Sequence, residues 1–194
     1  MNKVQSIIPP KWDPGQAAVA GAVATLVYSV SMEGDKFITG NRFSDVRFLE
    51  GLLAGEKRAK RFYILAWIIH FLTGIALAEI YAAMVKRFLP GPNWLKGILF
   101  SEMFIISLWW LTPLADKHHP LIKSGDLPKL ANWTSFLQNL TRHLVFGLTL
   151  GLLCRDQSPR SLEQKQIFFF RNKEAIALGK RLADLVQAGR RCNL

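Results

Sequence analysis

The sequence predicts an all-α integral membrane protein, a four-helix bundle, and three observations support this. Four apolar stretches occupy most of residues 15–154. Each is about as long as the helix of roughly 20 residues that crosses a bilayer core of about 30 Å. Half of the 194 residues are hydrophobic, and the 20% that are charged gather mainly between and after these stretches. Small residues recur every four positions within the first, second and fourth of them, as they do where helices touch in lipid.

The polar and apolar segments divide the chain into a lead, a bundle and a tail. Residues 1–14 form a polar lead, whose Asp13 can cap the first helix. The fourth span can cross a membrane only if its polar first half faces protein. Residues 155–194 form a basic tail with an amphipathic helix. The spans are expected at about 15–32, 62–85, 97–115 and 133–154.

Two of the connections carry structural signals. The segment 33–61 contains an amphipathic pattern, with Phe48, Leu49, Leu52 and Leu53 on one helix face. Such a helix is expected to lie in the membrane interface rather than to cross it. A Pro-Gly-Pro sequence forces a tight break after the second span, so the second and third spans should be antiparallel neighbours.

The net charge of +11 bears on partners and location. Surplus Lys and Arg in a membrane protein favour contact with anionic lipid headgroups. The sequence contains no nucleic-acid recognition motif, so we expect no nucleic acid as a partner. Four spans place both termini on one side of the membrane, and the basic tail favours the cytoplasmic side for both.

Two of the spans share a short pattern. His70, Gly74 and Ala78 follow one another at intervals of four in the second span, and His143, Gly147 and Gly151 do so in the fourth. The chain is therefore interpreted as two tandem hairpins, related by an approximate two-fold axis along the membrane normal. Convergence on a common packing pattern is the alternative.

The small residues predict a helix-packing seam. In lipid, helices associate through close backbone contact at Gly, Ala, Ser and Thr, because burying Leu gains little there. The stripes of the first, second and fourth spans are expected to meet at the bundle axis. The seam residues are Ala17, Gly21, Thr25, Gly74, Ala78, Gly147 and Gly151.

Ionisable groups at membrane depth are candidate functional residues. His70 and His143 lie at similar depths and could ligate a haem or chlorophyll-type tetrapyrrole, or a metal ion. The alternative is that each histidine hydrogen-bonds a neighbouring helix or lines a small water pocket. No separate metal site with typical ligand spacing is predicted.

Two carboxylates form a second candidate group. Glu79 and Glu102 lie at similar depths on adjacent spans and could share a proton. Alternatively, each reaches towards a lysine near the end of its span. The sequence contains no catalytic motif such as a Ser-His-Asp set, a P-loop or HExxH, so no catalytic residue is predicted and an enzyme is disfavoured without being excluded.

Several short elements follow one another along the chain: the residues 20–25, His70-Phe71 through Gly74, 89–91, 96–100, 113–115, 143–147 and Leu150-Gly151. Their order and spacing resemble those of the small four-span bacterial membrane proteins akin to the YagU-type inner-membrane proteins. This resemblance implies a bacterial inner-membrane protein, cytoplasmic or intracytoplasmic, whose activity is not established. The basic first loop and the long tail depart from the pattern.

Three function classes follow from these observations. The first is an accessory or structural membrane protein, a subunit or partner of a larger complex or a homo-oligomer. The second is a tetrapyrrole- or metal-binding electron-transfer or pigment protein that uses His70 and His143. The third is a small transporter or proton pathway that uses Glu79 and Glu102.

Overall fold

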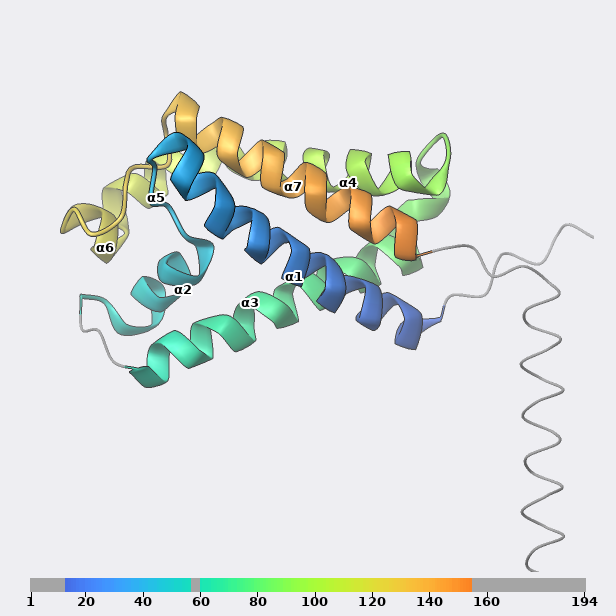
Figure 1. Cartoon of the computed structure of the whole chain (residues 1–194), viewed down its shortest axis with the longest axis horizontal. Helices are drawn as coiled ribbons and strands as arrows, with labels where there is room; N and C mark the ends of the chain where they lie inside the picture. Colours follow the sequence, from blue (N-terminus) through green and yellow to red (C-terminus); the bar gives the residue numbers. More distant parts are fainter. Residues whose placement is uncertain (1–12, 57–59, 155–194) are drawn as a thin grey trace, which may run out of the picture. The chain divides into compact units, whose positions relative to one another are not determined.

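The computed structural model describes residues 13–56 and 60–154, which lie within one compact unit of the chain. Every regular element in these residues is helical, as the sequence predicts (Figure 1). The predicted amphipathic helix of the tail lies outside the described residues. The elements are α1 (Pro14–Thr39), α2 (Asp45–Ala54), α3 (Lys60–Ile80), the π-helical turn η1 (Tyr81–Val85), the 3-10 turn η2 (Lys86–Phe88), α4 (Asn93–Leu108), the 3-10 turn η3 (Trp109–Leu111), α5 (Thr112–His118), α6 (Pro120–Lys123) and α7 (Trp133–Leu153).

Within the described residues, three helical segments are long and apolar enough to cross a membrane. They are Pro14–Thr39, Lys60–Phe88 and Asn93–His118, and each contains one of the first three predicted spans. The first begins as predicted, because Asp13 accepts a hydrogen bond from the Gln16 backbone N–H at 3.2 Å. It continues seven residues beyond the predicted end at Met32, to a glycine with positive φ at Gly40.

The helix α7 has 21 residues but is not among the segments that are apolar enough to cross a membrane. It begins at Trp133 as predicted, where the Asn132 side chain caps it by accepting from the Ser135 backbone N–H. In its first half, four polar side chains are buried inside the protein: Ser135, Gln138, Asn139 and Arg142. The polar half therefore faces protein. This is the condition predicted from the sequence for the fourth segment to cross a membrane.

The helices α1 and α3 pack through small residues. A Cβ atom added at Gly21 would lie 2.7 Å from the Ala78 Cβ and 2.8 Å from the Gly74 carbonyl oxygen. One at Gly74 would overlap Thr25. Since real Cβ atoms do not come this close, only glycine permits the contact.

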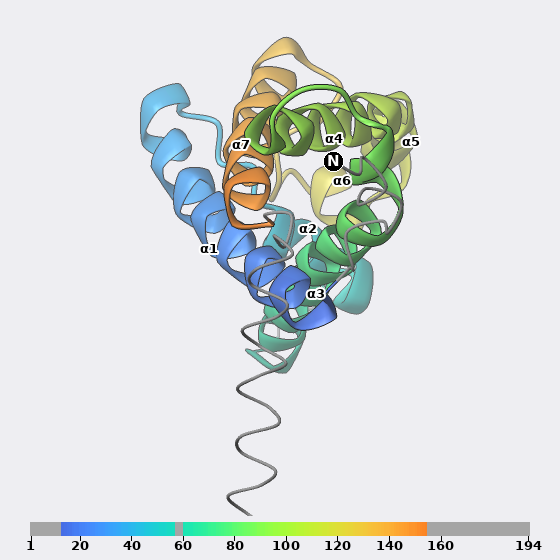
Figure 2. The same cartoon turned by 90° about the vertical axis from the view of Figure 1, so that its right-hand side faces the viewer.

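The helices α4 and α7 pack in the same manner. A Cβ atom added at Gly97 would lie 2.8 Å from the Gly151 Cα, and one at Gly147 would lie 2.8 Å from the Ser101 Cβ. Ser101 also donates a hydrogen bond of 2.7 Å to the His143 carbonyl oxygen. Backbone contact at glycine therefore joins α4 to α7, as it joins α1 to α3 (Figure 2).

The prediction that three stripes meet at one axis was wrong. The α1 stripe meets the α3 stripe, whereas Gly147 and Gly151 face α4. The reason is that Gly97 and Ser101 supply a fourth small-residue stripe, on α4, which takes the place expected for α1. The seam is thus two separate contacts.

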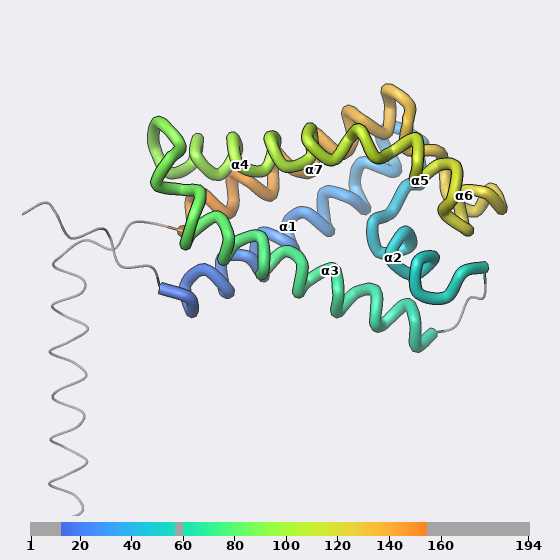
Figure 3. The backbone as a smooth tube through the Cα atoms, turned by 180° about the vertical axis from the view of Figure 1, so that it is seen from behind, coloured from blue at the N-terminus to red at the C-terminus, as the bar shows by residue number. Residues whose placement is uncertain are grey.

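The helices α3 and α4 are joined by η1 and η2, and they touch chiefly through these turns. From there they diverge towards the end of the molecule that holds α2, α5 and α6 (Figure 3). The helix α2 packs on α3 with Val46 buried, while Leu52 and Leu53 of the predicted apolar face are 60% and 38% exposed. His119 holds α2 from the other side, since its Nε2 donates to the Phe48 carbonyl oxygen at 2.8 Å.

Candidate functional site

The centre of the site is Arg142, whose side chain is fully buried. It lies in the first half of α7 and binds the carboxylate of Asp35 on α1 through two nitrogens, Nε and Nη2. The Nη2–Oδ1 distance is 2.7 Å. A bidentate pair of this kind fixes both the distance and the orientation of the two helices that carry it.

A second carboxylate also binds the guanidinium. Asp45, at the start of α2, accepts from Nη1 of Arg142 at 3.3 Å. The Tyr28 hydroxyl donates to the same Asp45 oxygen at 2.9 Å, and the Phe43 carbonyl oxygen accepts from Nη2 at 3.2 Å. The guanidinium is therefore surrounded by acceptors from α1, α2 and the loop between them.

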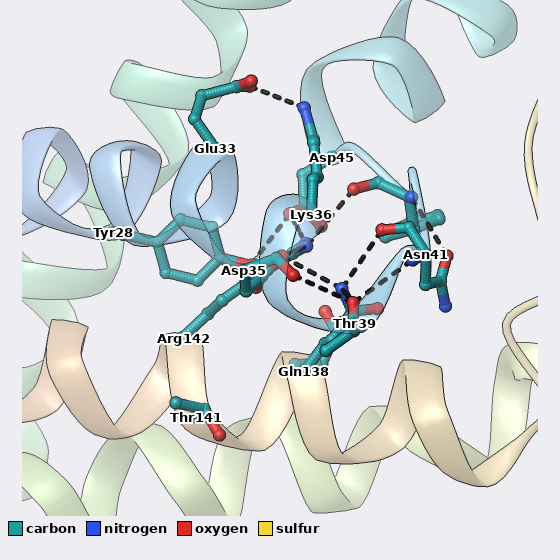
Figure 4. A network of polar contacts seen from close by, with 12 residues as sticks. Tyr28, Glu33, Asp35, Lys36, Thr39, Asn41, Asp45, Gln138, Thr141 and Arg142 are labelled. Atoms are coloured by element: carbon teal, nitrogen blue, oxygen red, sulfur yellow. Dashed lines mark hydrogen bonds and ion pairs between the residues drawn. The ribbon is translucent and has the colours of Figure 1, made fainter.

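The network continues along α7 through Gln138 (Figure 4). The Gln138 Nε2 lies within hydrogen-bond distance of an Asp35 oxygen (3.0 Å), the Thr39 hydroxyl (2.7 Å) and the Asn41 carbonyl oxygen (3.2 Å). The Asn41 side chain in turn donates to the Ser135 hydroxyl at 2.9 Å. These bonds fasten the end of α1 and the following loop to α7.

Beside this network lies a cavity of about 240 Å³. Residues of five helices surround it, and Asp45 and Tyr28 belong both to its wall and to the network. Its polar lining consists of Thr25, Tyr28, Asp45, His70, Thr73, Ser101, Asn139 and His143, and its apolar lining includes Phe48, Leu49, Leu77, Phe100, Phe104, Ile105, Leu108 and Phe146.

The two predicted histidines come together in this cavity. The Tyr28 ring contacts both, with centroid distances of 5.7 Å to His70 and 5.2 Å to His143. The shared cavity agrees with the similar depths inferred from the sequence. Whether the histidines bind a cofactor stays a prediction.

The hydrogen bonds of each imidazole assign its tautomer. Nδ1 of His143 lies 2.8 Å from the Asn139 carbonyl oxygen, and because a carbonyl only accepts, Nδ1 carries the hydrogen. Nε2 of His70 lies 3.1 Å from the Ser29 hydroxyl oxygen, which already donates its hydrogen to the Thr25 carbonyl. Nε2 of His70 is therefore the donor of that pair.

The predicted carboxylates lie elsewhere. Neither Glu79 nor Glu102 lines the cavity. Both carboxylate oxygens of Glu102 are buried without a hydrogen-bond partner among the described residues. The described part of the chain also holds no cluster of three or more His, Cys, Asp or Glu side chains arranged for a metal ion.

With the geometry in place, the chain can be compared with known proteins. The model of the DUF6789 family, a family of unknown function, matches residues 13–163. The chain belongs to this family. No curated protein and no solved structure matches it. The region shared with the DUF6789 family includes both helix pairs, the Arg142 network and the cavity.

Four residues of this site were not predicted: Arg142, Asp35, Asp45 and Tyr28. One signal was present for Arg142, because a lone arginine within an apolar segment must find a partner. The sequence carried no such signal for Asp35 and Asp45, because both lie in a segment whose composition indicates a polar connection. Only the extension of α1 beyond Met32 carries Asp35 to Arg142.

Proposed function

We propose that the protein is an integral membrane accessory protein, a four-helix bundle that is a subunit or partner of a larger membrane complex. The observation that carries the membrane placement is an inverted distribution of side chains. Arg142, a charged group, is fully buried, whereas large apolar side chains of α3, η1 and α4 point outward. The exposed fractions include Ile64 50%, Leu72 58%, Met84 59%, Met103 61% and Ile106 49%.

An apolar exterior of this extent is costly in water and favourable in lipid. The membrane is proposed to be the bacterial inner membrane, with both termini in the cytoplasm and α2 in the opposite interface. The outward position of Leu52 and Leu53 on α2 supports the interfacial location.

Membrane placement and orientation are tested together by cysteine labelling. The two native cysteines are replaced, and single cysteines are introduced at Phe37, 89% exposed near the end of α1, and at Leu72 in mid-helix. A membrane-impermeant maleimide on intact cells should label Phe37→Cys and leave Leu72→Cys unlabelled. Recovery of the chain in the aqueous fraction would contradict the proposal, and labelling at Phe37 only after lysis would reverse the orientation.

The accessory role has a separate test. The phenylalanines 168–170, with Arg171 and Lys173 next to them, are proposed as a partner-binding segment. The full chain is purified in mild detergent beside a variant with Arg171→Gln and Lys173→Gln. A partner at fixed stoichiometry with the wild type, and its loss with the variant, is expected. A wild-type preparation that is a single chain would contradict a stable complex.

A cofactor-binding function is the second candidate, because His70 and His143 line one cavity. A purified sample from native membranes would then show a Soret or chlorophyll band that His70→Ala removes. A sample without visible absorption would reject a tetrapyrrole at this site. The Tyr28 ring against both imidazoles and a cavity below the usual 300–1,000 Å³ of ligand pockets favour a smaller ligand.

A further inference from the structure

The hydroxyl groups that line the cavity already donate their hydrogens to acceptors within the protein. The hydroxyls of Thr25, Thr73 and Ser101 donate to backbone carbonyl oxygens at 2.7–2.8 Å. The Tyr28 hydroxyl donates to Asp45. Both imidazole N–H groups donate as well, as assigned above. A ligand that brings only acceptors therefore finds few partners here.

Acceptors, in contrast, remain. With the hydrogen of His143 on Nδ1, the neutral ring has a lone pair on Nε2. Nδ1 is bound to the carbonyl of its own helix, so Nε2, at the far end of the ring, lies away from that backbone. It has no hydrogen-bond partner among the described residues, and His143 lines the cavity. Asp45, 27% exposed, is a second acceptor in the wall.

The shape of the cavity limits the size and character of the ligand. Its volume of about 240 Å³ exceeds the ~150 Å³ cavity that admits benzene. Phe48, Phe100, Phe104 and Phe146 supply aromatic walls. The space lies where α3 and α4 diverge, between helices whose outer faces are apolar, so a tail attached to the ring could continue into hydrocarbon (Figure 3).

From these observations we propose that the cavity binds a lipophilic phenol: an aromatic ring whose hydroxyl donates to His143 Nε2 and whose apolar tail leaves between α3 and α4. The class includes the hydroquinone heads of membrane quinols. A phenol is a stronger donor than an aliphatic alcohol, and its ring fills the aromatic walls. This inference rests on the membrane placement proposed above.

The test compares two probes, 4-hexylphenol and its methyl ether 4-hexylanisole, in which a methyl group replaces the hydrogen that the phenol donates. Binding to the full chain in lipid nanodiscs is measured by calorimetry, with empty nanodiscs subtracted for partitioning. The phenol should bind about tenfold more tightly. Equal affinities for the two probes, or tighter binding of 1-decanol than of the phenol, would overturn the proposal.

Histidine nitrogen NMR gives a readout that does not depend on a variant folding. In ¹⁵N-histidine-labelled protein, the phenol should shift the unprotonated nitrogen of His143, and the anisole should not. The His143→Phe variant should lose both the shift and the preference, while His118→Ala, an exposed histidine outside the cavity, keeps them. A chain that inserts in nanodiscs yet shows no preference refutes the ligand alone; a chain that fails to insert refutes the membrane placement.

Discussion

The first hairpin consists of α1 and α3, and the second of α4 and α7. Two contacts join the hairpins, α1 with α7 and α3 with α4. The α1–α7 contact is closed, because the helices touch along their length, whereas the α3–α4 contact is open, because the helices diverge. Each pairs the first helix of one hairpin with the second helix of the other. At the closed contact, Arg142 and Gln138 bind the end of α1. At the open one, α3 and α4 meet chiefly at η1 and η2, and the cavity fills the space between them.

The residues at corresponding positions explain the difference. Arg142 directly precedes His143, whereas Ile69 directly precedes His70. Asp35 lies as far beyond Gly21 as Leu111 lies beyond Gly97. The closed contact thus has a complementary charge pair where the open one has two apolar residues. In the proposed membrane an apolar pair would gain little from association, which accounts for the closed contact being the charged one.

Within each hairpin the two helix pairs are alike. Gly21 packs on Gly74, and Gly97 packs on Gly147, each at the helix level expected from the repeated pattern. Four residues after the first glycine of each pair, Thr25 contacts Gly74 and Ser101 contacts Gly147. These equivalent contacts support the interpretation of two tandem hairpins. The two hairpins are therefore alike internally, and the asymmetry of the molecule lies in the two contacts that join them.

The largest expected effect comes from removing the charge at the closed contact. Arg142→Met leaves Asp35 and Asp45 without their shared cation in a buried site and should lower the free energy of unfolding by about 3–5 kcal/mol. The matched control at the open contact is Ile69→Met, which should cost less than about 1.5 kcal/mol. Denaturant unfolding in detergent measures both. Equal losses would mean that the network does not distinguish the two contacts.

An intermediate effect is expected at the glycine contacts within the hairpins. Gly21→Ala and Gly97→Ala each force a Cβ atom against backbone or Cβ atoms of the facing helix and should cost about 1–3 kcal/mol. Similar losses of stability in the two variants, measured as shifts of the thermal unfolding midpoint, would support the equivalence of the hairpins. A tolerated alanine at one site only would break it.

The smallest effect, and one of opposite sign, is expected at Gly34. It lies inside α1, and a Cβ atom added there meets nothing within 4 Å. Gly34→Ala should therefore stabilise the protein by up to about 1 kcal/mol, because alanine loses less backbone entropy in a helix. The same thermal unfolding assay measures the change. Destabilisation would show that the far end of α1 is more crowded than its contacts indicate.

The local features of the fold could be predicted from the sequence. The cap at Asp13, the start of α7 at Trp133 and the break after the second span follow from residue types whose effects are local. The shared depth of His70 and His143 also followed, because equal spacing along two helices of the same length gives equal depth. The partners of Arg142 could not be predicted, since nothing in their own segment marks Asp35 and Asp45 as buried acceptors.

The sequence by itself determined the helices, their apolar character and the glycines through which they touch. These depend on composition and on a period of about four residues, which any helix displays along its own length. Only the tertiary structure decided which stripes meet, which contact closes and where the cavity lies. Those outcomes depend on pairing across long separations, such as Arg142 with Asp35, and a pairing of that kind is specified by neither residue alone.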